Sequence, residues 1–418
     1  MSWSLAGRLV YALCQWLMLL VLARLGGLEA VGRFALALAV TGPIVLFSNL
    51  GLRHVQATDA DGSYDYADYL AVRGWTTIAA LVVLAVVIAL AYDAGETARV
   101  IALVALAKGF ESMSDVVYGL EQVRQRLDLT TRSLCLRGLS GVVAMILGYW
   151  LGGDLTASVA AMTAAWAGCY LLYDLPAQRR LLAEPQPDAR PAARPRPTGD
   201  SARRRRLAWV ALPMGVVALL ISLNVNVPRY FIEAWLGEQA LGAFAAMFYF
   251  VVVGSLVVNG LGQATLVNLA ACDARGQRRV FLRLLGRLVA ASLGLGLVGV
   301  LASWLLGRQL LTLLYGAAFA RDAGLFVWIM IAGALNYAAS ALFYGVTARR
   351  IFVGQAVLYA AVTAVNAGAC ALLIGGHGVL GVVWAWIAAL VVQIGLSLLL
   401  IARGGGGEPA APAAVAGA

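Results

Sequence analysis

Charged residues are scarce in this chain, and two charge-bearing residue types are almost missing. Only 12% of the residues are charged, the single lysine is Lys108, and the two histidines are His54 and His377. Hydrophobic residues make up 62% and the mean hydropathy is +0.84, whereas soluble domains are about 45–50% apolar and about 25% charged. Such a chain has too little polar surface to cover itself in water, which excludes an ordinary soluble domain.

Residues for metal, disulfide and nucleophilic chemistry are also few. The two histidines are too far apart to suggest a metal site or a Ser/His/Asp set. No GxxxxGK(S/T) sequence occurs, so ATP is not the direct energy source. We expect no metal, no cofactor and no enzyme activity. The cysteines stand singly, without disulfide or metal-ligand spacing, at Cys14, Cys135, Cys169, Cys272 and Cys370.

The sequence does contain a series of apolar blocks of about 20 residues, the length that crosses a hydrocarbon layer of roughly 30 Å. The alternating segments of about 10 residues that a transmembrane β-barrel requires do not occur. The first block, 5–21, lacks a cleavage site, so we expect a retained helix. The pattern predicts an all-α integral membrane protein with about twelve transmembrane helices, at 5–24, 30–52, 70–92, 97–119, 131–151, 155–175, 208–232, 241–267, 283–306, 323–347, 352–374 and 378–401.

Arginines concentrate in every second connection between these spans. Arginine-rich loops stay on the cytoplasmic side of a membrane, so both termini are expected in the cytoplasm. The rich connections carry Arg53, Arg73, Arg124, Arg126, Arg132, Arg275, Arg278, Arg279, Arg283, Arg287, Arg349 and Arg350. The poor connections carry Arg24, Arg33, Arg99, Arg229, Arg308 and Arg321.

A basic segment rich in proline and arginine divides the chain. It predicts an N-terminal six-helix bundle at 1–176, a cytoplasmic linker at 177–207, and a C-terminal six-helix bundle at 208–403. The linker has no hydrophobic period and is expected to be disordered. We interpret its charge as a topology determinant near anionic lipids rather than a nucleic-acid site. Residues 404–418 predict a disordered low-complexity tail.

The two halves resemble each other. Residues 27–49 align without gaps to residues 237–259, at a constant offset of 210. The shared unit, G-x-x-A-(V/L)-G-x-F-A, predicts a short outer turn that enters the second helix of each half. Both copies run inward, which indicates two pseudo-symmetric bundles around a central cavity, an architecture typical of transporters. The coinciding pairs are Gly27/Gly237, Ala30/Ala240, Gly32/Gly242, Phe34/Phe244, Ala35/Ala245, Leu46/Leu256 and Asn49/Asn259.

Charged residues inside spans are functional candidates because each costs about 2.5–3.5 kcal/mol to insert. Lys108 falls near the expected midplane, and Glu111 and Asp115 follow at i+3 and i+7 on the same helical face. One interpretation is a self-neutralising pair, with Asp115 hydrated near the cytoplasm. The other is a cation site or a cation–proton exchange site in a wet cavity. The sequence leaves both open.

The predicted span at 208–232 carries a second polar group. Around Pro228, freed carbonyls together with Asn224 and Asn226 are expected to line a cavity. Arg229 then presents a guanidinium suited to bidentate phosphate contact, or it snorkels to the outer headgroups.

Other polar residues are weaker candidates for substrate contact. Arg24, Arg53 and Arg137 are possible anion contacts, although each is expected near a helix end or in a hydrated position. Asn259 and Gln263 either form interhelical hydrogen bonds or contact sugar hydroxyls, and the sequence does not separate these roles.

Several stretches resemble the O-antigen and exopolysaccharide flippases of the multidrug/oligosaccharidyl-lipid/polysaccharide superfamily. They are LGLRHVQATD at 50–59, YLAVRG at 69–74, YGLEQVRQRLDLTTRSLCLRG at 118–138, ISLNVNVPRYFIEAWLGEQALGAFAAMFYFVVVGSLVVNGLGQA at 221–264 and LLTLLYGAAFA at 310–320. The resemblance covers most of the chain except the linker and tail.

This resemblance implies a polyprenyl-pyrophosphate-linked oligosaccharide as substrate, moved across the bacterial inner membrane by alternating access. It implies Lys108, Arg229 and Arg53 as pyrophosphate contacts, and Glu111 and Asp115 as the site of a coupling proton or sodium ion. Expected partners are membrane lipids and, as protein candidates, a polysaccharide polymerase and chain-length proteins, with no nucleic acid.

Three alternatives remain at this stage. A cation-coupled multidrug exporter of the same superfamily is favoured by a cavity with more acid than base, and the excess of arginine argues against it. A membrane glycosyltransferase, polymerase or ligase usually needs large outer loops, and the outer loops predicted here are short. A scaffold that transports nothing differs from a carrier only in its response to mutation of the intramembrane charges.

Overall fold

The computed structural model describes residues 2–59, 63–184, 201–349 and 351–403, and in these ranges the regular structure is helical. Helices form because a backbone in lipid must satisfy its own hydrogen bonds within each segment. Residues 185–200 of the predicted linker and the whole predicted tail lie outside the described residues. The described parts of the linker differ from the expected disorder, because residues 177–183 belong to α8 and residues 201–207 to α9. The elements are α1 Ser2–Leu25, α2 Gly27–Ser48, α3 Leu52–Thr58, α4 Tyr66–Ala91, α5 Glu96–Val123, α6 Leu127–Gly152, α7 Leu155–Cys169, the π-helix η1 Tyr170–Asp174, α8 Leu175–Ala183, α9 Ser201–Ala274, α10 Arg278–Leu314, the 3-10 helix η2 Ala317–Ala320, α11 Ala323–Ala348 and α12 Phe352–Arg403.

Nine helices within the described ranges are long and apolar enough to cross a membrane. Two of them, α9 and α12, each consist of two helices that meet at a non-helical glycine, Gly237 (φ 80°) and Gly378 (φ 57°). Gly237 falls in a predicted connection between spans, and Gly378 is the first residue of the span predicted at 378–401. The charged helix α5 is not among the nine, so the number twelve stays a prediction.

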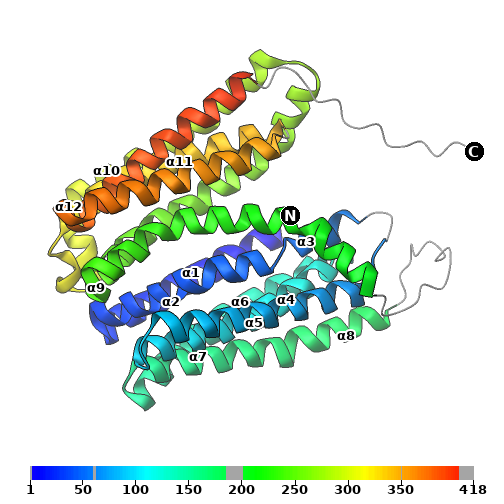
Figure 1. Ribbon diagram of the computed structural model, residues 1–418, viewed down its shortest axis with the longest axis horizontal. Coiled ribbons are helices and arrows are strands. Elements are labelled where there is room, and N and C mark those ends of the chain that lie inside the picture. The colour runs from blue at the N-terminus through cyan, green and yellow to red at the C-terminus, as the bar shows by residue number, and fades with distance from the viewer. Residues whose placement is uncertain (1, 60–62, 185–200, 350, 404–418) are drawn as a thin grey trace, which may run out of the picture.

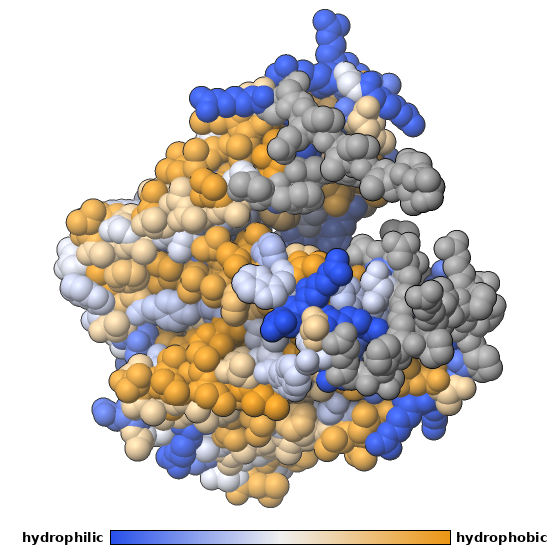
Figure 2. All heavy atoms as spheres, turned by 45° about the vertical axis from the view of Figure 1, so that its right-hand side comes forward, coloured by the Kyte–Doolittle hydropathy of each residue, from blue (hydrophilic) through white to orange (hydrophobic). Residues whose placement is uncertain are grey.

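The helices form two groups that meet at one end and diverge at the other (Figure 1). One group contains α1, α2 and α4–α8, and the other contains α10–α12 with the second half of α9. The first half of α9 packs on α2, where a Cβ on Gly215 would lie 2.9 Å from the carbonyl oxygen of Phe47. Figure 2 shows a hollow between the two groups on the side where they diverge. We call this side the open end and the opposite side the closed end.

Two prolines inside helices release carbonyl groups that bond to neighbouring helices. Pro43 of α2 leaves the carbonyl of Ala39 without its helical donor, and the hydroxyl of Tyr230 on α9 donates to that oxygen at 2.5 Å. Pro228 of α9 likewise releases the carbonyl of residue 224, to which a side-chain amide of α12 donates at 3.0 Å. These bonds fix α9 against both groups of helices.

The repeated sequence unit makes the contact at the closed end. Gly27 and Gly237 both have positive φ, 72° and 80°, as a tight turn before a helix requires. Five residues later, Gly32 packs against the backbone of Glu238, and Gly242 packs against the backbone of Leu28. The two halves therefore meet in a reciprocal contact of backbone on backbone.

Ion pairs surround this contact. Arg33 of α2 is paired with Glu29 of its own helix, with Glu96 of α5, and with Glu238 of α9 at 2.7 Å. The hydroxyl of Thr97 also donates to Glu238 at 2.5 Å. Because Glu238 belongs to the second half of the chain, these bonds join the two groups of helices. We refer to Arg33, Glu29, Glu96 and Glu238 as the ionic latch.

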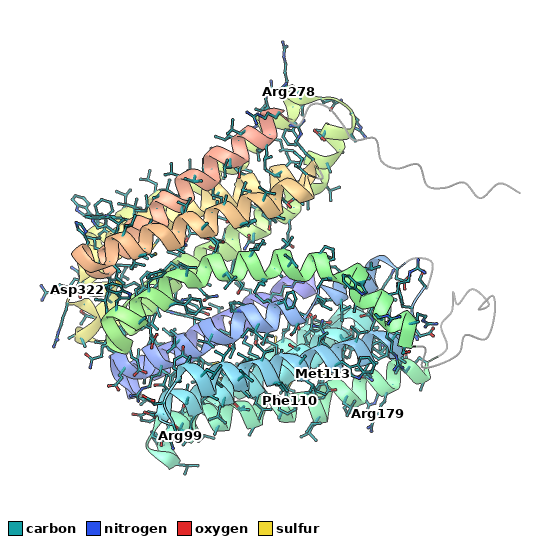
Figure 3. The ribbon with its side chains drawn as sticks, viewed as in Figure 1. Arg99, Phe110, Met113, Arg179, Arg278 and Asp322 are labelled. Carbon is teal, nitrogen blue, oxygen red and sulfur yellow. The ribbon has the colours of Figure 1, made fainter. Side chains whose placement is uncertain are left out.

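The loops segregate between the two ends as the arginine pattern predicts. Figure 3 shows Arg99 and Asp322 at the closed end, and Arg179 and Arg278 at the opposite end. The open end therefore carries the arginine-rich connections.

Candidate functional site

An apolar pocket lies between α1, α2, α5 and α7, and α9 contributes one wall. In this conformation its cavity volume is about 40 Å³, room for a few water molecules. Phe34, Leu38 and Trp166 provide apolar and aromatic surface, Lys108 provides a cation, and Tyr249 of α9 faces them from the other half of the chain. Because both halves line it, the pocket changes shape when the two groups of helices move.

Lys108, which lines this pocket, forms an ion pair with Glu111. The Lys108 ammonium lies 2.7 Å from the Glu111 carboxylate, and the hydroxyl of Tyr11 donates to the other oxygen at 2.9 Å. The ammonium also lies 5.6 Å from the centre of the Trp166 ring. Side-chain exposures of 19% and 27% leave both charges reachable.

Arg229 is a second cation close to the pocket. Its guanidinium donates to Asn226 at 2.5 Å and lies 4.9 Å from the centre of the Phe248 ring, and it interacts electrostatically with Tyr249. No carboxylate in the described part of the chain lies within 4.0 Å of it, and its Nε has no hydrogen-bond partner. Because this half-buried guanidinium has no countercharge, it can pair with and donate hydrogen bonds to a bound anion.

Asp115 is separated from Lys108 and Glu111 by its own partners. It lies 2.8 Å from Arg73 of α4 and 3.8 Å from Arg53 of α3. Arg73 is fully buried and also bonds to Asn49, although the sequence places it in a cytoplasmic connection. The three charged residues that the sequence places on one face of α5 therefore belong to two separate ion-pair clusters, Lys108 with Glu111 and Asp115 with Arg73 and Arg53.

Arg137 and Asp174 form a third pair, with both side chains 0% exposed and 2.9 Å between their charged atoms. Ser114 and Ser133 donate to the same carboxylate at 2.5 and 2.6 Å. The expectation that Arg137 lies near a helix end or in a hydrated position is therefore wrong, because the residue lies inside α6 and is fully buried in the helix packing. In this conformation it is enclosed and faces no substrate space.

The remaining candidates lie apart from the pocket. Arg24 is exposed and donates to the backbone of α10 at the closed end. The side-chain oxygen of Asn224 accepts from Asn366 of α12 at 3.2 Å. Asn259 accepts from the Tyr344 hydroxyl at 3.3 Å, and the exposed Gln263 also interacts with Tyr344. These contacts join helices, and whether the residues also meet substrate stays a prediction.

Sequence reasoning missed Asp174 and Tyr249. Asp174 could have been found from the sequence, since it is an acid that interrupts the apolar run LLYDLP near the end of the predicted sixth span. Tyr249 has no such signal in the sequence, because a tyrosine in an apolar helix is common and its place in the pocket depends on how the two halves pack.

Comparison with known proteins assigns the chain to a protein family. A profile described as polysaccharide biosynthesis protein matches residues 1–267, more than half of the chain. The chain belongs to this polysaccharide biosynthesis protein family. The chain is similar to the capsular polysaccharide biosynthesis protein CapF of Staphylococcus aureus, with 26% identity over 346 residues, which are 83% of this chain and 84% of that protein.

Solved structures confirm the fold. An inward-facing multidrug resistance MATE family transporter of the MOP superfamily matches with a TM-score of 0.73 at 13% identity, over 94% of this chain and 93% of that one. The lipid II flippase MurJ in an inward closed conformation matches with a TM-score of 0.70 at 10% identity, over 94% and 86%. The predicted family and the all-α membrane fold are thus confirmed.

Proposed function

We propose that this protein is a flippase that moves polyprenyl-pyrophosphate-linked oligosaccharide from the cytoplasmic to the outer leaflet of the bacterial inner membrane. Family membership places it in polysaccharide biosynthesis, and the fold is that of carriers with two helix groups. The proposal includes bundles at 1–176 and 208–403 and cytoplasmic termini. With arginine-rich loops inside, the hollow opens to the cytoplasm, where such lipids are built.

The observation that carries the proposal is the uncompensated charge of Arg229 beside a pocket that also contains Lys108. A pyrophosphate cannot cross hydrocarbon unescorted because burying an unpaired charge is very unfavourable. Arg229 and Lys108 offer it cations, while Trp166 and Tyr249 offer sugars aromatic surface. The lipid tail stays in the membrane between the two groups of helices. An ion gradient is the proposed energy source, with a proton or sodium ion as the carrier of charge.

Deletion of the gene in its host tests this function. We expect lipid-linked oligosaccharide to accumulate in the inner leaflet, measured by protection from a membrane-impermeant glycosidase in spheroplasts. Wild type restores outer-leaflet exposure, and Lys108→Ala and Arg229→Ala fail although they are expressed. Arg308→Ala, which removes an exposed arginine on α10, serves as the matched control and restores it.

The multidrug exporter gives a different result in the same strains. If the glycan and its intermediates are unchanged while resistance to cationic dyes falls, the flippase function is wrong. Glu111 and Asp115 of α5 have cationic partners at 2.7 and 2.8 Å and offer no free carboxylate to a cationic drug, so we expect no loss of dye resistance.

A further inference from the structure

One buried carboxylate has no cation beside it. Glu121, near the end of α5 that faces the open end, is 0% exposed, and no lysine or arginine in the described residues lies within 4.0 Å of it. Thr130 of α6 donates to Oε2 at 2.5 Å, whereas Oε1 has no hydrogen-bond partner. By contrast, Glu111, Asp115 and Asp174 each have a cation within 2.9 Å.

The surroundings of Glu121 determine which charge state is stable. Burial without a countercharge disfavours the ionised form of a carboxyl group. Two nearby carboxylates oppose a negative charge and two guanidinium groups, both beyond ion-pair distance, favour it. The groups that act on Glu121 from the packed elements are Arg53 of α3, Tyr66 of α4, Arg126 before α6, Asp128 of α6, and Tyr173 and Asp174 of η1.

Arg53, which acts electrostatically on Glu121, lies next to a strained turn at residues 50–51, which we call the hinge. Its guanidinium lies 3.8 Å from Asp115 and donates to Gln122 at 3.2 Å. It is carried by α3, which follows two successive residues in the left-handed region, Leu50 (φ 49°) and Gly51 (φ 59°). A non-glycine residue with such a backbone is strained, and strained positions concentrate at moving segments. A negative charge on Glu121 competes with Asp115 for Arg53 and pulls on this hinge.

The hinge contacts α9 at the open end. A Cβ on Gly51 would lie 2.9 Å from the side chain of Met214. Movement of α3 therefore reaches the helix that links the two groups, on the side where they separate.

We propose that Glu121 is a proton-binding site, neutral in the conformation described here, and that loss of its proton draws Arg53 away from Asp115. No covalent bond other than the O–H bond forms or breaks. The proton-binding step stands on its own, whereas its use as the coupling site rests on the proposed function. Under this proposal the coupling proton binds to Glu121, and Glu111 and Asp115 remain ion-paired carboxylates.

Infrared spectroscopy of the purified protein in lipid nanodiscs tests the proton without any substrate. Wild type at neutral pH is expected to show the C=O stretching band of a protonated carboxyl group, which Glu121→Gln removes and Glu184→Gln, at an exposed position on the same side, retains. Thr130→Val is expected to shift the frequency of the band, because it removes the hydroxyl that donates to this carboxyl group. Absence of the band in wild type, or its persistence in Glu121→Gln, overturns the proposal.

Proteoliposomes with an imposed pH gradient test the coupling. We expect the gradient to accelerate lipid-linked oligosaccharide movement several-fold in wild type and not in Glu121→Gln, which still equilibrates the lipid without a gradient. Equal acceleration of both proteins overturns the coupling role. If neither protein moves the lipid, the flippase function fails, and the infrared result still decides whether Glu121 binds a proton.

Discussion

Gly32 and Gly242 occupy equivalent positions in the two halves of the chain, and each packs against the backbone of the other half. A Cβ on Gly32 would lie 1.8 Å from the carbonyl oxygen of Glu238, and a Cβ on Gly242 would lie 1.9 Å from that of Leu28. The offset of 210 residues converts one contact into the other, because it relates Gly32 to Gly242 and Leu28 to Glu238. The closed end is therefore closed by a pseudo-symmetric crossing that has no room for a side chain.

Alanine at either glycine should open this end. We expect Gly32→Ala and Gly242→Ala to disfavour closure by about 1–3 kcal/mol or more, since the opposing atoms are backbone and cannot turn aside. Pulsed EPR between spin labels on α2 and α9 at the closed end should show a longer distance. Gly294→Ala on α10, where an added Cβ meets no atom within 4 Å, is the control. Unchanged distances in both glycine variants would contradict the described closure.

The ionic latch should contribute less than the glycine crossing. The side chains of Arg33 and Glu238 are each 22% exposed, and such pairs are typically worth about 0.2–1 kcal/mol. Glu238→Gln should lengthen the same EPR distances in a fraction of molecules, and the difference from wild type should shrink at high salt because ions screen the pairs.

Two variants complete the test of the latch. Asp93→Asn changes an exposed acid at the same end and should have no effect. The exchange Arg33→Glu with Glu238→Arg should recover only part of the closure, because Glu29 and Glu96 then oppose a carboxylate. Full closure in Glu238→Gln at low salt would show that the latch does not stabilise this end.

The Arg137–Asp174 pair should contribute strongly to the stability of the folded protein. Removing one partner of a fully buried ion pair costs about 3–5 kcal/mol because the other charge is left uncompensated. Arg137→Met alone should lower the thermal unfolding temperature in detergent strongly, and Arg137→Met with Asp174→Asn should recover much of the loss. A stable single variant with weakened lipid binding would instead place Arg137 in the substrate site.

Much of the fold could be predicted because lipid imposes a simple rule on sequence. Apolar blocks of span length mark the helices, and the predicted connections near 237 and 378 coincide with the glycines at which α9 and α12 break. The repeated unit correctly predicts a turn and a helix entry. Its second glycine could not be explained beforehand, since the role of Gly32 appears only when the two halves cross.

The candidate site was less predictable because charge pairing depends on helices distant in the sequence. Lys108 and Glu111 pair as their i, i+3 spacing suggests. Asp115, at i+7, pairs instead with Arg73 of another helix, a residue that the sequence pattern places in a loop. A span boundary read from hydropathy cannot tell a loop arginine from one that folds back into the packing.

Arg229 should recognise the anionic group of the substrate. Charge-assisted hydrogen bonds are worth about 1.5–3 kcal/mol, so Arg229→Ala should weaken binding of a short-chain polyprenyl-pyrophosphate glycan about ten- to hundredfold. Arg229→Lys should retain part of the affinity, because lysine keeps the charge but loses the two-pronged geometry. Calorimetry on nanodiscs measures both, with Arg308→Ala as the control. Equal affinity in wild type and Arg229→Ala would exclude this residue from the site.

Flipping by the purified protein tests the central claim most directly. Proteoliposomes would contain a fluorescent polyprenyl-pyrophosphate oligosaccharide, and a membrane-impermeant quencher would report how much of it remains exposed on one leaflet. We predict that wild type equilibrates the lipid between leaflets much faster than protein-free vesicles, and that Arg229→Ala does not. Equal rates with wild type and without protein, at confirmed incorporation, would contradict the flippase function.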